Sequence, residues 1–259
     1  MNALGPLLNG WTIANPAALA ILLAFLALLI VLAARARAGH GAALRPIPAF
    51  DAIKQAVGQA AELGRPLHVA LGTGGIGKLS TLETLAGIEA LEYLAHQAAL
   101  CDAPLTVSVA DPTVLPTAQE TLYRGYEQAG YPDEYDSTRV QLLAPDNVAY
   151  AAGVMTTLHQ QNLAANVMVG TFGDEFLLMG ETGARRGIPQ IGGTTNPQAL
   201  AFAYASMNHV LLGEEIYAAG AYLRQDRNHV GGLMAQDVMR LAIVAAAIIG
   251  AILRTLGIL

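Results

Sequence analysis

A glycine-rich stretch following an apolar run is the part of this sequence whose residue types and spacing most clearly suggest chemistry. "HVALGTGGIGKLSTLE", His68 to Glu83, is typical of a buried strand, a tight turn and the start of a helix. Gly72, Gly74 and Gly77 have the G-x-G-x-x-G spacing of dinucleotide-binding turns. The acidic residue that should follow about 20 residues later is missing, because Asp111 lies 34 residues beyond Gly77.

The same stretch also resembles a phosphate-binding Walker A loop, since Gly72 to Lys78 reads G-T-G-G-I-G-K. That loop needs Ser or Thr directly after the lysine to hold magnesium, and here Leu79 precedes Ser80. A working ATP-hydrolysing loop is therefore disfavoured. Two interpretations stay open: backbone N–H groups that hold a phosphorylated ligand, or glycines that only permit a tight turn. The candidate binding residues are Gly72, Thr73, Gly74, Gly75, Gly77 and Asp111.

Polar side chains also follow other predicted strands, where a parallel sheet would gather them at its carboxyl edge. Each of them taken alone is more often a helix cap. These residues are Asp111, Thr171, Asp174, Glu175, Thr194, Thr195 and Asn196.

The sequence names no catalytic or metal-binding residue. The six histidines lack the i, i+4 spacing of a metal-binding helix, and no Ser/His/Asp set is recognisable. The single cysteine, Cys101, excludes an intramolecular disulfide and a cysteine cluster for zinc. Glu181 could form a buried pair with Arg185 or Arg186, or lie on a solvated helix face. Cofactors stay unknown, and an enzymatic activity is not favoured.

The elements that must position these residues are short apolar runs that alternate with longer helical ones. Predicted strands cover 66–71, 105–110, 140–144, 165–170, 188–193 and 208–213. This pattern predicts an α/β, Rossmann-like layered domain with a mainly parallel sheet over residues 46–232. We expect Gly72 to Gly77 at the carboxyl end of a central strand and Asp111 at the end of its neighbour.

Three local signals refine this expectation. Ser80 and Glu83 form a capping-box pattern for the helix after the glycine turn. Asp146 can cap a later helix. Gly231 and Gly232 are expected to form a hinge into a C-terminal segment.

The N-terminal segment 16–34 has no charge and is long enough for a transmembrane helix, with Asn15 as its N-cap. A signal peptide is the alternative, but no charged residue precedes Pro16. Arg35, Arg37 and Arg45 follow the helix, so the positive-inside tendency predicts an extracytoplasmic segment 1–15 and a cytoplasmic α/β domain.

A second membrane helix is predicted over 233–259. Its apolar run, Leu241 to Leu253, has 13 residues and is too short to cross a bilayer unless Arg254 reaches the outer interface or packs against another helix. A helix lying in the inner interface is the alternative. The expected localisation is the cell membrane, with two passes.

Composition agrees with a membrane location, since the 259 residues are 54% hydrophobic and 13% charged. A net charge of −6 argues against a nucleic-acid partner. The expected partners are the lipid bilayer, further copies of the chain and a phosphorylated small molecule.

The runs "STLETLAGIEAL", "NVAYAAGVM", "MGETGARRGIPQIGGT" and "LLGEEIYAAGAYL" resemble a prokaryotic family of membrane-anchored proteins catalogued as a domain of unknown function. The resemblance covers about Phe50 to Leu223 and implies no activity. We therefore expect a membrane-anchored structural or scaffolding subunit of a homo-oligomeric assembly. The alternative is a nucleotide- or phosphorylated-ligand-binding protein or enzyme that uses the glycine turn.

Overall fold

The structure, a computed structural model, describes residues 16–39 and 44–255, which belong to two compact units. One unit combines Met1–Leu44 with Gln225–Leu259, and the other is the continuous segment Arg45–Arg224. The predicted segment 1–15, with Asn15, lies outside the described residues.

The unit Arg45–Arg224 contains, in the part of the chain described, six parallel strands in one sheet. Their order is β3-β2-β1-β4-β5-β6, so the chain passes from one side of β1 to the other between β3 and β4. All six predicted strands are confirmed, and the sheet is parallel throughout. The strands are β1 (Leu67–Gly72), β2 (Leu105–Val109), β3 (Val140–Leu142), β4 (Ala165–Thr171), β5 (Gln190–Thr194) and β6 (His209–Leu212).

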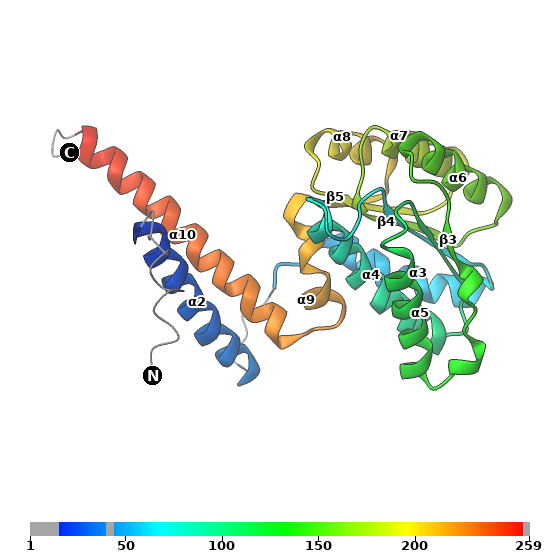
Figure 1. The fold of residues 1–259 in the computed structure, drawn as a ribbon, viewed down its shortest axis with the longest axis horizontal. Coiled ribbons are helices and arrows are strands. Elements are labelled where there is room, and N and C mark those ends of the chain that lie inside the picture. Colours follow the sequence, from blue (N-terminus) through cyan, green and yellow to red (C-terminus); the bar gives the residue numbers. More distant parts are fainter. Residues whose placement is uncertain (1–15, 40–43, 256–259) are drawn as a thin grey trace, which may run out of the picture. The chain divides into compact units, whose positions relative to one another are not determined.

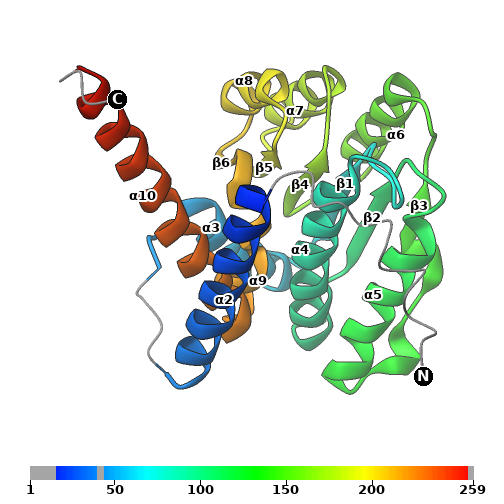
Figure 2. The same cartoon turned by 60° about the vertical axis from the view of Figure 1, so that its left-hand side comes forward.

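Helices cover both faces of this sheet, which makes the unit a three-layered α/β fold (Figures 1 and 2). One face carries α3 (Pro48–Leu63), α4 (Thr81–Leu100), α5 (Leu115–Ala129) and α9 (Ala219–Leu223). The other carries α6 (Asn147–Gln160), α7 (Glu175–Arg185) and α8 (Pro197–Ser206). Short 3-10 helices are η1 (Pro132–Glu134), η2 (Ser137–Arg139) and η3 (Gly213–Ala218).

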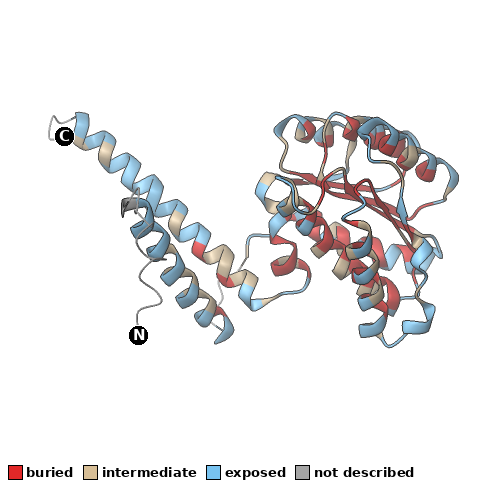
Figure 3. Ribbon diagram, in the orientation of Figure 1, coloured by how far each residue is buried: buried red, intermediate tan, exposed pale blue. Residues whose placement is uncertain are grey.

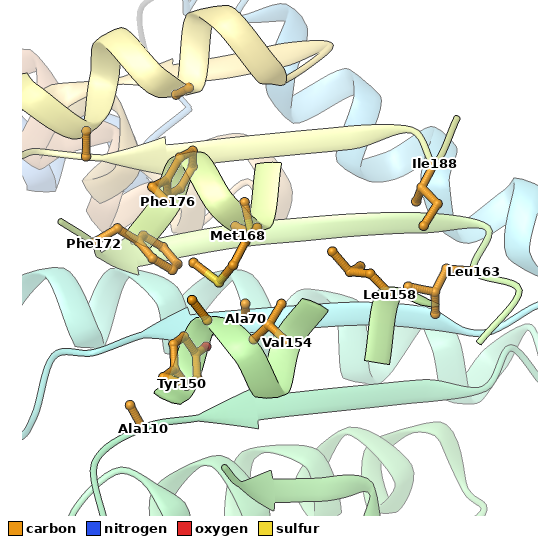
Figure 4. Close-up of a cluster of buried hydrophobic side chains, with 14 residues drawn as sticks. Ala70, Ala110, Tyr150, Val154, Leu158, Leu163, Met168, Phe172, Phe176 and Ile188 are labelled. Atoms are coloured by element: carbon orange, nitrogen blue, oxygen red, sulfur yellow. The ribbon is translucent and has the colours of Figure 1, made fainter. Parts of the chain in front are cut away.

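The four central strands, β2, β1, β4 and β5, are buried along nearly their whole length because both faces are covered, whereas the edge strands β3 and β6 are partly exposed (Figure 3). Under α6, α7 and α8, Tyr150, Phe172 and Phe176 pack with Met168 in a cluster that closes the carboxyl half of the sheet (Figure 4). This packing holds the ends of β1, β2 and β4 in fixed positions, as a site at that edge requires.

A chain of hydrogen bonds between buried polar side chains runs across four strands. The Gln190 Nε2 donates to the backbone oxygens of Gly180 and Ser206, which leaves Gln190 Oε1 to accept from Asn166. Asn166 Oδ1 then accepts from His68 Nδ1 at 2.8 Å, and His68 Nε2 accepts from the Ser108 hydroxyl at 2.8 Å. His68 is thereby held neutral, and its burial lowers its pKa to about 4.

The second unit contains α2 (Pro16–Arg37) and α10 (Arg227–Thr255), which pack side by side and are long and apolar enough to cross a membrane. The expected hinge at Gly231 and Gly232 is wrong, because both glycines lie inside the continuous helix α10. Gly231 fits there because a Cβ at this position would meet the Ala33 backbone at 2.5 Å. The α/β unit accordingly ends at Arg224, eight residues before Gly232.

Candidate functional site at the carboxyl edge

The glycine turn follows β1 at the centre of the sheet and is bound to the end of β4. Gly72 has φ +79° and donates its N–H to the buried hydroxyl of Tyr150 at 3.3 Å, while Thr73 N donates to the Thr171 oxygen at 2.9 Å. A Cβ on Gly72 would lie 2.1 Å from that same Thr171 oxygen. Only glycine therefore fits at this position.

Four of the next five backbone N–H groups, those of Gly75 to Lys78, donate to side-chain hydroxyls of the protein itself. Gly75 N bonds Ser80 Oγ at 3.1 Å and Ile76 N bonds Thr113 Oγ1 at 3.0 Å. Gly77 N and Lys78 N both bond Thr81 Oγ1, at 2.9 and 3.0 Å. The N–H groups that a phosphate would use are therefore occupied by hydroxyls, which must rotate before an anion can bind.

The capping box expected from Ser80 and Glu83 is wrong. Ser80 makes no side-chain cap bond to α4, because its hydroxyl already accepts from Gly75 N. Glu83 reaches across the edge and accepts hydrogen bonds from the hydroxyls of Thr171 and Thr195. Both side chains thus connect α4 to other turns of the edge.

Asp111 follows β2 and lies beside the glycine turn. Its Oδ2 accepts from Lys78 Nζ at 2.5 Å, and its Oδ1 accepts from the Thr113 N–H and hydroxyl at 2.8 and 2.6 Å. The hydrogen bonds from Lys78 and then Thr113 hold the pKa of Asp111 at about 2, so this carboxylate is ionised at neutral pH. A Cβ on Gly75 would lie 2.5 Å from Asp111 Oδ2, which explains the glycine there.

A third carboxylate, Glu175, is buried at the start of α7. It accepts hydrogen bonds from Gly173 N at 2.8 Å, from the Thr73 hydroxyl at 3.4 Å and from Asn147 Nδ2 at 3.5 Å. Glu175 therefore joins the glycine turn to the turns after β3 and β4. In the described residues Glu83, Asp111 and Glu175 give this edge an acidic, hydroxyl-rich character.

The remaining edge residues from the sequence have mixed roles. Asn196 caps α8 by accepting from Gln198 N and donates to the Phe172 oxygen, and Thr194 Oγ1 accepts from Asn196 N. Asp174 stands at the N-cap position of α7 but makes no cap bond with its side chain. Asp146 caps α6, as predicted.

The structure brings Asp111 beside the glycine turn, as the sequence predicts. Topology explains how this happens despite the long spacing, because the 20 residues of α4 separate the turn from β2. Sequence reasoning missed Tyr150 because it sits in an apolar helix. It also missed the full role of Glu83, because a glutamate three residues after a serine resembles an ordinary cap residue.

One further alternative from the sequence is resolved. Glu181 and Arg185 form an exposed i, i+4 ion pair at 2.6 Å, so the solvated-face interpretation is confirmed. Within residues 16–39 and 44–255, no group of three or more His, Cys, Asp or Glu side chains could hold a metal ion.

Comparison with known proteins places the chain in one family. No curated protein and no solved structure matches it. The family described as a domain of unknown function (DUF6754) matches residues 9–259, far more than the segment on which the sequence resemblance rests. The chain belongs to the DUF6754 family.

Proposed function

We propose that the α/β unit binds a small ligand of nucleotide type at the carboxyl edge of its sheet, and that α2 and α10 hold the unit at a membrane. One observation carries this proposal: the glycine turn after β1 lies between Asp111 after β2 and Thr171 after β4. From β1 the chain continues towards one edge of the sheet, and from its spatial neighbour β4 it continues towards the other edge. Open α/β sheets bind ligands at the point where the strand order reverses in this way.

The chemistry of the edge supports a ligand with both a sugar and a phosphate. Ionised Asp111 can accept hydrogen bonds from two neighbouring sugar hydroxyls. Lys78 has a side chain that is 60% exposed and can turn from Asp111 to a phosphate. When the hydroxyls of Ser80, Thr81 and Thr113 rotate to donate to the phosphate, the N–H groups of the turn become free to bind it.

Calorimetric titration of the full-length protein in detergent tests this with a panel of nucleosides, nucleotides, dinucleotides and inorganic phosphate. We expect one class of nucleotide to bind, and Asp111→Asn to weaken that binding at least tenfold, about 1.4 kcal/mol. Absence of binding across the panel contradicts the proposal.

The chain offers a matched control for this substitution. Asp136 accepts from the Thr138 N–H at 2.9 Å and from its hydroxyl at 2.7 Å, the same local arrangement that Asp111 has with Thr113. Asp136→Asn removes the same charge away from the glycine turn and should leave nucleotide binding unchanged. Equal weakening of nucleotide binding by both substitutions would show that Asp111 does not contact the nucleotide and that it affects binding only by stabilising its own turn.

The second candidate is a structural or scaffolding subunit of a homo-oligomeric assembly. Three leucines at the glycine turn and on the first turns of α4 favour it, because they expose apolar surface: Leu79 is fully exposed, and Leu82 and Leu85 are 66% and 42% exposed. A particle containing several copies that binds no member of the panel would support this candidate.

The α/β unit is further proposed to lie in the cytoplasm, with both termini outside. Arg35, Arg37 and Arg45 support this orientation through the positive-inside tendency. Cys101 is exposed on the α/β unit and serves as a natural reporter. It should resist a membrane-impermeant maleimide in intact cells and react after lysis; rapid labelling in intact cells would reverse the orientation.

A further inference from the structure

The carboxyl edge carries a second group of polar side chains, on the other side of the glycine turn from Asp111. Glu83 accepts hydrogen bonds from the hydroxyls of Thr171, the last residue of β4, and Thr195, which follows β5. The Tyr217 hydroxyl bonds Thr195 in turn. These four side chains, called the Glu83 group below, have no role in binding a single nucleotide at Asp111.

Two neighbouring glycines of the turn lie against the two sides. A Cβ on Gly74 would be 2.6 Å from Thr171 Oγ1, and a Cβ on Gly75 would be 2.5 Å from Asp111 Oδ2. In the sheet, β4 and β5 lie two and three places from β2, roughly 10 and 14 Å away at about 4.8 Å per strand. A single ribose is much shorter than this separation. Two sugars joined through a pyrophosphate can straddle the turn and reach both Asp111 and Glu83.

The strand order divides the sheet into two halves of the kind that binds a dinucleotide. In the order β3-β2-β1-β4-β5-β6, each half holds one nucleotide and the pyrophosphate lies between them, at the turn after β1. Asp111 follows β2 and lies in the first half. Glu83 belongs to α4, but its hydrogen bonds to Thr171 and Thr195 hold its carboxylate over the second half. Each half therefore has a carboxylate of its own.

The third carboxylate of the edge, Glu175, is committed to the protein. It is 5% exposed, and Gly173 N, the Thr73 hydroxyl and Asn147 Nδ2 donate to its oxygens. Glu83 is half-buried and accepts one hydroxyl hydrogen bond at each of its two oxygens. Because each carboxylate oxygen has two lone pairs, Glu83 can accept two further hydrogen bonds from a ligand.

The chemistry of the Glu83 group fits a nucleoside. The two neighbouring hydroxyls of a ribose are donors that Glu83 can accept. Tyr217 is 39% exposed, so its ring offers a surface on which a base can stack. Burial and then the charge of Glu83 raise the pKa of Tyr217, so its hydroxyl stays neutral beside the ligand.

We propose that the ligand of the carboxyl edge is a dinucleotide, with one nucleoside at Asp111, the pyrophosphate at the glycine turn and the second nucleoside at the Glu83 group. Glu83 accepts hydrogen bonds from the second ribose, and Tyr217 stacks on its base. Lys78, whose side chain is exposed beside the turn, supplies positive charge to the pyrophosphate. This inference rests on the proposed function and specifies the class of nucleotide.

Calorimetric titration of the full-length protein in detergent tests the need for a second nucleoside. The probes are the four ribonucleoside diphosphates, the glucose ester of each, and five dinucleotides: NAD⁺ and the four symmetric dinucleoside diphosphates. The tightest dinucleotide should bind at least tenfold more tightly than the nucleoside diphosphate it contains, because its second nucleoside binds as part of the same molecule. It should also bind at least fivefold more tightly than the matching glucose ester.

The outcomes of this titration separate the inference from the proposed function. A nucleoside diphosphate that binds as tightly as its dinucleotide overturns the inference and leaves nucleotide binding at Asp111 intact. An equal gain from the glucose ester would show that the second half recognises a sugar alone, and the dinucleotide would then be wrong. Absence of binding by every probe overturns both.

Glu83→Gln separates the second half of the site from the first. It should lower dinucleotide affinity at least tenfold and change nucleoside diphosphate affinity less than twofold, whereas Asp111→Asn should weaken both classes of probe. Retained nucleoside diphosphate binding shows that the variant is folded. Glu181→Gln removes an exposed carboxylate from α7 and is the matched control, with neither class affected. Equal effects of Glu83→Gln on the two classes contradict the inference.

Tyr217 allows a separate test of where the second base lies. Tyr217→Ala removes the ring and should lower dinucleotide affinity at least fivefold, with nucleoside diphosphate binding unchanged. Tyr217→Phe keeps the ring and should stay within twofold of the unmodified protein. If Tyr217→Ala binds the dinucleotide as tightly as the unmodified protein, no base lies against this ring and the proposed position of the second nucleoside is wrong.

Discussion

At the scale of single residues, Gly72 and Gly77 have similar backbone angles in different surroundings. Their φ values are +79° and +85°, but a Cβ would meet the Thr171 oxygen at 2.1 Å from Gly72 and nothing within 4 Å from Gly77. The left-handed conformation costs a side chain about 1–2 kcal/mol in both cases. At Gly72 the contact with β4 adds to that cost.

We therefore expect Gly72→Ala to lower the free energy of unfolding by about 3 kcal/mol or more, and Gly77→Ala by about 1–2 kcal/mol. Urea denaturation of the two full-length variants, followed by the fluorescence of their tyrosines, measures the difference. Equal losses would mean that the turn can move away from β4, and that the close contact of Gly72 with Thr171 is not fixed.

His68 makes stability depend on pH through its buried hydrogen bonds. Its pKa is about 4 in the folded protein and 6.5 when exposed. Below pH 6.5 His68 is protonated in the unfolded chain, but in the folded chain it stays neutral until about pH 4. The contribution of His68 to the free energy of unfolding is therefore fully present above pH 6.5 and is lost as the pH decreases. The loss attributable to His68 should reach about 3 kcal/mol at pH 4.

The free energy of unfolding, measured from pH 7.5 to pH 4, checks this expectation. His68→Gln should be less stable at pH 7.5 and should show a shallower decline between pH 6.5 and 4. His159→Gln changes an exposed histidine on α6 and should keep the original slope. If His68→Gln also keeps that slope, the pH dependence has another source.

At the scale of elements, local patterns predicted what each segment forms but not which side chains the edge would use. The six strands follow from apolar runs, and the cap at Asp146 follows from residue type. The Ser80 and Glu83 prediction failed because Ser80 accepts from Gly75 N within the turn and Glu83 makes tertiary contacts instead. Glu83 bonds Thr195, which is 112 residues away, and no local signal encodes such a pairing.

The adjacent glycines of α10, Gly231 and Gly232, also show that a local sequence pattern does not predict tertiary contacts, and they allow a matched test. Gly231 packs against α2, whereas a Cβ added at Gly232 would have nothing within 4 Å, so only the first needs to be glycine. Gly231→Ala should push α2 and α10 apart and weaken their packing by about 1–3 kcal/mol. Gly232→Ala should be neutral or stabilise the helix by up to about 1 kcal/mol.

Disulfide formation between cysteines placed at Ala36 and Asn228, in the Cys101→Ser chain, reports the separation of the two helices. It should slow in Gly231→Ala and remain unchanged in Gly232→Ala. Equal rates in both variants would show that the close approach at Gly231 does not hold the pair together.

At the scale of the whole molecule, the sequence predicted an α/β fold between two apolar helices, and the structure has both. It predicted that the strand before Asp111 lies next to the strand before the glycine turn, but it could not predict the full strand order, because hydrophobic runs do not encode which strands become neighbours. That order places Asp111 next to the glycine turn although 34 residues separate it from Gly77. No acidic residue follows the glycines at the spacing of the dinucleotide pattern, but the strand order places an acidic residue, Asp111, at the same edge of the sheet.

Hydrogen–deuterium exchange of the full-length protein in nanodiscs tests whether the carboxyl edge of the sheet binds a ligand. The probe is a millimolar mixture of adenosine, guanosine, cytidine and uridine nucleotides, compared with buffer alone. We expect slower exchange in residues 73–81, 111–115 and 171–175, with no change at the opposite edge around residues 186–190. Unchanged exchange at the carboxyl edge, or protection confined to the opposite edge, would contradict it.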